Sequence, residues 1–484
     1  MGLDIIYYEK ALQAKAQTDI DLAIKYYKKT LQLNNQFIEA YVNLTNIYYD
    51  LKKFTIAKKL IKKAIKYCNT NAILYDMLAL IYQELNKYNK AIKYHKKTLF
   101  IDNQSAQYYV NYSLTLFYNN KFKKSLFYAK QALIYSCDIR VYLNLATLYQ
   151  MLKKSKKSKK YYTIALKIDH NNADALFGLS LVYLQCNDIL NGFKYYESRW
   201  NYSSFTTKKR DYLQPKWNGN IIKNKKLFIH YEQGYGDNIM FVRFINQVKK
   251  ISQAYIILEI SKPLYKLFSK YTNGWDKLIL LNKNFIDFDY YLPIMSIPNA
   301  LNLRKKNIIK DKYLNIKNDH KNNNKEFRIG ISWKGSKTHI LDNRRSIDLN
   351  ILEPLFDLKN TIFYSLEIDT NTQQELKEYP KIINLGKKIN NFYDTAKYIQ
   401  ELDLVICVDT SVAHLSGALG KPTFILLSKI SDWRWGKKDN NIWYNSISLY
   451  RQKKIDIWRT PIKNIKNDII ILVNKTSKEK RIPN

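Results

Sequence analysis

The sequence predicts a multidomain protein in which an N-terminal all-α solenoid is followed by two doubly wound α/β domains. Two observations predict this order. Residues 1–200 repeat a pattern of two apolar helices with a period of about 34 residues. From residue 225 onward, short strand-like apolar runs alternate with helical segments, which is typical of a parallel sheet covered by helices.

Length and composition limit the class of protein. A chain of 484 residues has room for about three domains. No apolar run approaches the ~18 residues that a membrane span needs, and the start MGLDIIYYEK lacks a secretory signal pattern. We therefore expect a cytoplasmic protein with free thiols, because its cysteines occur singly and without metal-ligand spacing. They are Cys68, Cys137, Cys186 and Cys407.

The formal net charge of +39 is large enough to attract nucleic acid, anionic lipid or an acidic acceptor. The chain is also rich in Asn, Ile and Tyr, and its lysines run along the whole length, which favours the compositional drift of an A/T-rich genome. The aromatic-basic motifs of nucleic-acid binders are missing. We expect no nucleic-acid partner, and membrane contact only of a peripheral kind.

Residues 1–200 carry small and aromatic residues at fixed repeat positions. The small set is Ala23, Ala57, Ala91, Ser125, Ser158 and Gly192, and the seam set is Tyr48, Tyr82, Leu116, Tyr149 and Tyr183. This pattern resembles the tetratricopeptide repeat, whose stacked helix pairs form a curved solenoid. The resemblance implies a concave face that holds a protein or glycan acceptor. A structural spacer is the alternative, and His95 fits packing better than chemistry.

The remaining boundaries follow from composition. Residues 201–224 form a connector, in which Trp200, just before it, and Trp217 are expected to pin the chain, and residues 225–316 form the first α/β domain. Residues 317–326 are polar and form a hinge, residues 327–465 form the second α/β domain, and residues 466–484 form a C-terminal helix, expected over residues 467–474, and a tail.

Two strand-to-helix turns are the candidate site. In the first domain, Gly234 and Gly236 make a tight turn that bares Asp237 at a helix start, where a plain N-cap is the alternative role. In the second domain, an apolar strand over 404–408 leads through Asp409 into a short helix. Free backbone N–H groups and the positive helix end make such a turn suitable for phosphate, although an ordinary capped helix is the alternative.

Three motifs carry a family resemblance over residues 225–465: GYGD, then ISWKGS with DNRRSI, then VDTSVAHLSGALGKPTFILL with DWRW. They resemble the GT-B glycosyltransferases of the heptosyltransferase type, in which two Rossmann-like domains enclose a nucleotide sugar. The architecture is also similar to that of tetratricopeptide-bearing O-GlcNAc transferases. The first domain would then lie on the acceptor side, and the second would bind the nucleotide sugar.

The resemblance implies roles for single residues. Asp237 would be the general base that deprotonates the acceptor hydroxyl in one inverting displacement. Four residues of the second turn would hold or order the donor diphosphate, and His414 would face the same phosphate. These four are Asp409, Thr410, Ser411 and Val412. Capping for Asp409 and packing for His414 are the alternatives.

Further donor-site candidates follow from the same resemblance. Lys334 would reach the phosphates, either Arg344 or Arg345 would do the same, and Glu367 would contact the ribose. Trp333 and Trp433 would wall the donor pocket, with core packing as the alternative. No metal and no other cofactor is expected, and the motif at residues 287–289 (Asp-Phe-Asp) resembles a metal-binding DxD by chance.

The resemblance therefore implies a metal-independent inverting glycosyltransferase with an ADP-heptose-like or other nucleotide-diphosphate sugar as co-substrate, which acts on a hydroxyl of a protein or glycan acceptor. Two alternatives stay open. One is a UDP-GlcNAc-dependent protein O-glycosyltransferase. The other is a non-catalytic repeat scaffold with a degenerate transferase module.

Overall fold

The computed structural model describes residues 2–271, 274–282, 286–316, 326–336, 342–437, 441–455 and 457–479. The chain divides into two compact units. The first comprises residues 1–150 and 156–170, and the second comprises residues 151–155 and 171–484.

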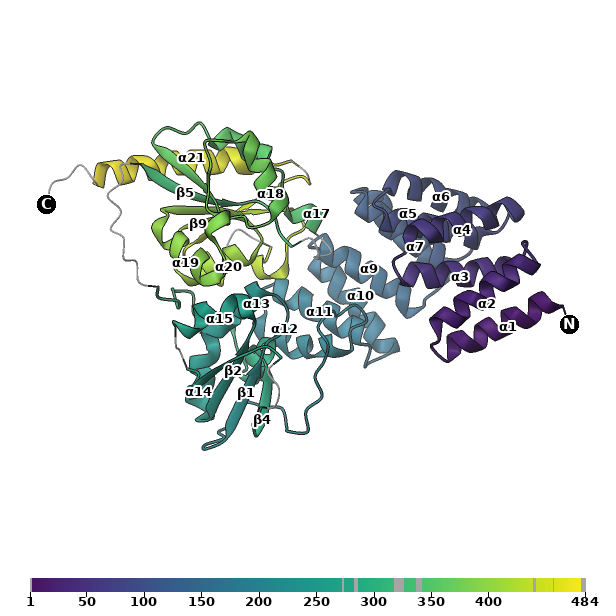
Figure 1. The fold of residues 1–484 in the computed structure, drawn as a ribbon, viewed down its shortest axis with the longest axis horizontal. Helices are drawn as coiled ribbons and strands as arrows, with labels where there is room; N and C mark the ends of the chain where they lie inside the picture. Colours follow the sequence, from purple (N-terminus) through teal and green to yellow (C-terminus); the bar gives the residue numbers. More distant parts are fainter. Residues whose placement is uncertain are drawn as a thin grey trace. The chain divides into compact units, whose positions relative to one another are not determined.

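The first unit is a stack of antiparallel helix pairs (Figure 1). Its helices are α1 (Leu3–Ala16), α2 (Ile20–Leu33), α3 (Ile38–Asp50), α4 (Phe54–Tyr67), α5 (Ala72–Glu84), α6 (Tyr88–Ile101), α7 (Ala106–Tyr118), α8 (Phe122–Tyr135), α9 (Ile139–Met151) and α10 (Ser155–Ile168). The two helices of each pair are joined at a residue with positive φ, as at Lys52 (57°), Asn86 (56°) and Asn120 (59°). One left-handed residue reverses the chain, which explains the short polar turn of each repeat.

Close helix crossings hold the pairs together, as the small residues predict. Ala23, Ala57, Ala91 and Ser158 are fully buried, and Ser125 is nearly so. Aromatic rings pack within a pair, where Tyr82 stacks on Tyr94 with 5.4 Å between ring centroids, and between pairs, where Tyr88 stacks on Tyr118 at 6.2 Å. The predicted all-α repeat solenoid is confirmed.

The second unit begins with α11 (Ala173–Gln185) and α12 (Ile189–Tyr196), which the sequence assigns to the repeats. These helices belong to the same core as the α/β part of the chain. Phe193 of α12 packs edge-on against Phe241 and Trp433, at 5.6 and 5.8 Å between centroids. The last helix pair is therefore a built-in part of the second unit.

A first parallel sheet has the strand order β3-β2-β1-β4. Its strands are β1 (Lys226–His230), β2 (Tyr255–Ile260), β3 (Lys277–Leu280) and β4 (Tyr290–Pro293), and the helices of this part are α13 (Tyr235–Phe241), α14 (Ile245–Ser252), α15 (Lys262–Ser269) and α16 (Ile297–Ala300). Helical residues pack with Leu227 and Ile229 of β1. A doubly wound domain would have helices on the opposite face of this sheet as well. Here the connector packs on that face instead: Tyr212 contacts Phe228 and Phe288, at 6.0 and 5.2 Å between ring centroids.

A second parallel sheet has the strand order β10-β9-β8-β5-β6-β7. Its strands are β5 (Phe327–Ser332), β6 (Thr361–Ser365), β7 (Ile383–Asn384), β8 (Leu404–Val408), β9 (Thr423–Leu427) and β10 (Ile447–Arg451), and its helices are α17 (Asp342–Arg345), α18 (Thr370–Glu375), α19 (Phe392–Glu401), α20 (Ser411–Ala418) and α21 (Arg459–Glu479). Leu404 and Ile406 of β8 enter one core, whereas Val405 and Cys407 enter the other. Both faces of this sheet are buried, as predicted, because the chain winds to either side of it.

The connecting segments differ in detail from expectation. Trp217 is buried and donates from Nε1 to the Asn220 carbonyl at 2.7 Å, so it pins the connector as predicted. Residues 317–325 of the expected hinge lie outside the described residues. The C-terminal helix begins at Arg459, earlier than expected, because Ile462, Ile465 and Ile469 bury one of its faces against the second sheet. No described helix is long and apolar enough to cross a membrane.

Candidate active site

The chain order of the second sheet reverses between β5 and β8. Counted within this sheet, the order is 3-2-1-4-5-6, and ligands of such sheets bind at the carboxyl strand ends beside the reversal. β8 is fully buried and ends at Val408, so Asp409 and Thr410 emerge at this point. The Thr410 hydroxyl accepts a hydrogen bond from the Val412 N–H at 3.3 Å and caps α20. Ser411 and Val412, both half-buried, form its first turn.

Helices α13 and α20 follow strands of different sheets, yet their first turns lie against each other. Gly236 makes this approach possible. A Cβ atom there would lie 2.8 Å from His414 Cδ2 and 3.5 Å from Ser411 Cα. The structure therefore brings Asp237, the next residue of α13, to the beginning of α20.

A buried arginine, Arg243, ties the segment that follows α13 to the rest of the second unit. Arg243 donates to the carbonyl oxygens of Ile309 and Trp443, at 2.7 and 2.6 Å. Its guanidinium also stacks on the rings of Tyr313 and Tyr444. Fully buried and surrounded by acceptors and aromatic faces, Arg243 fixes the chain after α13 to the segment before β10.

Both carboxylate oxygens of Asp237 have partners. Oδ2 accepts a hydrogen bond from the Gly234 N–H at 3.1 Å, and Oδ1 forms an ion pair with Nη2 of Arg434. The two side chains are 14% and 12% exposed, so the pair is shielded but still reachable from solvent. Gly234 is the N-cap of α13, so Asp237 is not the N-cap of the alternative interpretation but the third helical residue, whose side chain reaches back to the N-cap N–H. Asp237 also faces a cation from the other domain.

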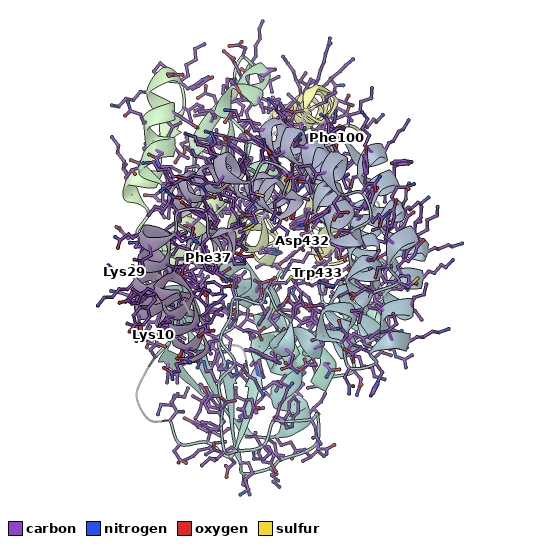
Figure 2. All side chains as sticks on the ribbon, turned by 90° about the vertical axis from the view of Figure 1, so that its right-hand side faces the viewer. Lys10, Lys29, Phe37, Phe100, Asp432 and Trp433 are labelled. Carbon is purple, nitrogen blue, oxygen red and sulfur yellow. The ribbon has the colours of Figure 1, made fainter. Side chains whose placement is uncertain are left out.

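Arg434 is a residue that the sequence did not single out. It lies in the 3-10 turn Trp433–Trp435, and its Nη1 donates to Asp432 Oδ1 at 2.8 Å (Asp432 and Trp433 are labelled in Figure 2). Burial alone would lower the pKa of Arg434, but the carboxylates of Asp237 and Asp432 outweigh it and raise that pKa. The sequence signal that could have indicated Arg434 is its position between two tryptophans, directly after Asp432 and Trp433.

Asp409 lies between two arginines and a second carboxylate. Burial, reinforced by Asp432, raises the pKa of Asp409 to about 6. Of the two adjacent arginines that the sequence left open, Arg345 donates from Nη1 to the Asp409 carbonyl at 3.2 Å. Arg344 is buried. The loop after β8 therefore has the positive charges of Arg345 and Arg434 beside it.

The end of β5 is held by acidic partners. Glu367 Oε1 accepts hydrogen bonds from the Ser332 hydroxyl and the Lys334 N–H, both at 2.9 Å, and burial raises the pKa of Glu367. Lys334 Nζ lies 3.1 Å from Asp348 and 3.2 Å from Glu375. Glu367 thus ties β6 to β5, and Lys334 would have to leave two carboxylates to reach a phosphate.

Three aromatic candidates are packing residues here. Trp333 is fully buried and donates to Glu375 at 2.8 Å. Trp433 packs against α12 and Trp443 and not on an open pocket, because the last helix pair covers it. Nδ1 of His414 shares a hydrogen bond of 2.9 Å with the Tyr444 hydroxyl. Burial lowers the pKa of His414 to about 3. A neutral histidine fits the packing alternative.

A second buried ion pair supports the strand end before Asp237. Arg199 donates to both oxygens of Glu232, at 2.6 and 2.8 Å, and both side chains are fully buried. Arg199 also donates to Ser296 and Glu197, at 2.8 and 3.2 Å. Glu232 lies two residues after the end of β1, so this network fixes the residues that lead into α13.

Among the described residues, no group of three or more His, Cys, Asp or Glu side chains could hold a metal ion. Asp289 accepts from the Lys226 N–H at 2.7 Å, and Asp287 pairs with the Lys226 side chain. Both therefore lie at the amino end of β1, away from the loops that carry Asp237 and Asp409.

Fold and site define a helical-repeat protein joined to a two-sheet α/β part with a charged turn at a topological reversal. Residues 38–71, 72–102 and 139–172 match the tetratricopeptide repeat, so the first unit is a tetratricopeptide-repeat solenoid.

The chain is similar to protein FlbA of Caulobacter vibrioides, with 21% identity over 327 residues, which are 58% of this chain and 52% of FlbA. It thus spans about half the length of this relative. Solved structures that resemble it are MamA (21% identity, 35% of this chain and 93% of MamA, TM-score 0.30) and a tetratricopeptide protein of Thermus thermophilus (18%, 37% and 99%, TM-score 0.35).

Proposed function

We propose that the protein is an inverting glycosyltransferase of the GT-B kind that transfers a sugar from a nucleotide-diphosphate donor to a hydroxyl group. One observation carries the proposal: Gly236, the neighbour of Asp237, lies against the first turn of α20, while Arg434 pairs with Asp237 and Arg345 holds the Asp409 carbonyl. A base and an anion-binding helix end are the two parts that such a displacement needs.

The proposed reaction is a single displacement. Asp237 takes the proton of the acceptor hydroxyl while its oxygen forms a bond to the anomeric carbon, and the bond from that carbon to the diphosphate breaks. Negative charge then grows on the diphosphate. The positive end of the α20 dipole and the guanidinium groups of Arg345 and Arg434 would stabilise it, so the protein itself supplies the positive charge.

The ion pair between Asp237 and Arg434 gives this proposal an order of events. While Arg434 occupies Oδ1 of Asp237, that oxygen is not open to the proton of an acceptor hydroxyl. An incoming diphosphate would compete with Asp237 for Arg434 and would bind it through charge-assisted hydrogen bonds. Donor binding would therefore release the base, and acceptor activation would follow it.

The solenoid supplies the other half of the proposal. Tetratricopeptide repeats typically bind protein partners on their concave face, and we propose that this face presents a protein or glycan acceptor. The shape of the pocket determines which sugar, which nucleotide base and which acceptor the protein binds. An ADP-heptose-like donor and UDP-GlcNAc both belong in the first screen.

The test is a thermal-shift screen of nucleotide sugars, since a ligand that binds only the folded protein raises its melting temperature. Arg345→Gln should abolish the shift of the best donor. Lys381→Gln is the matched control, because Lys381 is 82% exposed and pairs only loosely with Asp357 at 3.7 Å. If no nucleotide sugar shifts the parent protein, the proposed donor binding is wrong. If both variants keep the shift, the donor binds at another site.

A repeat scaffold without catalysis is the second candidate, and one observation favours it. Lys334 and Asp237 are both occupied by internal ion pairs, as in a site kept only for structure. Donor turnover separates the two functions. A scaffold would bind its partner without hydrolysing or transferring any sugar, whereas the transferase loses turnover when Asp237 is changed.

A further inference from the structure

Lysines in the solenoid are sorted by helix. The second helices of four consecutive pairs, α4, α6, α8 and α10, contain five, four, three and five lysines and no Asp or Glu. The first helices of the same pairs, α3, α5, α7 and α9, contain no lysine. Ordinary surfaces mix charges of both signs. Compositional drift along the chain would not remove every acidic residue from one row of helices, so this row is a basic face.

Part of this face is an aligned ladder. Lys62, Lys96 and Lys130 occupy the same position in three successive repeats, and all three are exposed. Lys28 of α2 continues the row. None of these four forms an ion pair within the described part of the chain. Because each repeat stacks on its neighbour, equivalent residues lie along one edge of the solenoid.

At or next to the end of the second helix of each pair lies a large apolar residue that is exposed to solvent. The exposed fractions are 46% for Leu33, 40% for Tyr67, 82% for Phe100, 68% for Ile134 and 55% for Ile168. Phe100, labelled in Figure 2, is the most exposed of them. Phe100, Ile134 and Ile168 recur every 34 residues, whereas Leu33 and Tyr67 lie one residue further along their repeats. Soluble surfaces seldom present large apolar residues in a periodic row, and a row of this kind marks an interaction surface.

The two rows adjoin. Lys96 and Phe100 are four residues apart on α6, and Lys130 and Ile134 are four residues apart on α8. Side chains at this spacing share one face of a helix. Phe127, 55% exposed and one further turn back on α8, extends the apolar part of the same face. On α6 and α8 the edge therefore combines cationic and apolar side chains on one helix face.

We propose that this edge, defined by Lys62, Lys96, Phe100, Lys130 and Ile134, docks the protein on an anionic lipid surface. The lysines complement the negative charge of the headgroups, and the apolar side chains enter the boundary with the acyl chains. A bilayer is flat and extended, so it can contact several repeats at once. A compact acidic protein would need its own matching apolar row, which makes lipid the better fit.

The test is flotation of the full-length protein with phosphatidylcholine vesicles, with and without phosphatidylglycerol. The parent should bind only the anionic vesicles, and added salt should weaken binding. Phe100→Ser/Ile134→Ser and, separately, Lys96→Glu/Lys130→Glu should each weaken binding by about tenfold or more.

Matched controls carry the same changes outside the solenoid. Leu213→Ser/Ile221→Ser removes two residues that are 102% and 66% exposed, and Lys387→Glu/Lys388→Glu reverses two exposed lysines. Both should bind like the parent. All changed residues are on the surface, and circular dichroism melts verify that the variants fold.

Three results would overturn the proposal. The first is no binding to anionic vesicles, and the second is equal binding to neutral ones. The third is binding to polyglutamate that Phe100→Ser/Ile134→Ser leaves intact while vesicle binding is weak, which would assign the edge to an acidic protein partner.

Discussion

Replacing Gly236 by alanine tests whether the closeness of α13 and α20 is essential. The new Cβ would lie 2.8 Å from His414 Cδ2, where ordinary contacts are 3.4–4 Å. His414 cannot yield easily, because it is buried, stacks on Trp435 at 5.3 Å and is hydrogen-bonded to Tyr444. The clash should therefore push the two helix ends apart.

The expected loss of stability is the balance of two opposing effects. Overpacking of a dense contact costs about 1–3 kcal/mol. Alanine is a better helix former than glycine by up to about 1 kcal/mol in a helix interior, and by less in a first turn. A net loss of roughly 1–2 kcal/mol should lower the melting temperature of the second unit by about 2–4 °C.

Gly234→Ala is the matched control, since its Cβ would meet nothing closer than Asp237 Oδ2, at 3.5 Å. Differential scanning calorimetry and donor affinity should be measured for both variants. Gly236→Ala should lose stability and donor affinity together, and Gly234→Ala should change both less. A Gly236→Ala protein as stable as its parent would refute the close approach on which the site depends.

Two further predictions concern buried charge. The pKa of Asp409 is raised from 3.8 to about 6, so the folded state holds this proton longer than the unfolded one and stability falls as pH rises from about 4 to 6. Asp409→Asn should therefore stabilise the protein by roughly 1–3 kcal/mol above pH 6 and by nothing below pH 4, and a pH-independent difference in urea titrations would contradict this. Arg199→Met should cost about 3–5 kcal/mol because it leaves Glu232 buried and unpaired, whereas Arg199→Met/Glu232→Met should recover most of the loss. Equal losses in the single and double variants would mean that packing dominates there.

The sequence predicted what depends on local periodicity. The helix pairs of the solenoid follow from small residues such as Ala57 and Ala91 at a fixed spacing, and both are fully buried. The strand over 404–408 followed from a run of apolar residues, and the structure has it with those bounds. Each of these signals lies within one repeat or one strand, so a single sequence carries it.

Pairings between distant segments could not be read in this way. Arg434 pairs with Asp237 across 197 residues, and Arg199 pairs with Glu232 across 33. Nothing in the spacing of charges indicates which of 41 acidic residues a given arginine will meet. Trp433 was assigned to a pocket for the same reason, because the sequence could not tell that α12 covers it.

The most direct test of the proposed site is the affinity of Asp237→Asn for the sugar nucleotide that gives the largest thermal shift, measured by calorimetry beside its transfer rate. The neutral side chain should release Arg434 to the diphosphate, so binding should tighten by about tenfold while transfer is lost. Asp357→Asn, at an exposed ion pair, should change neither quantity. Weaker donor binding by Asp237→Asn, or undiminished transfer, would contradict a base held in reserve by Arg434.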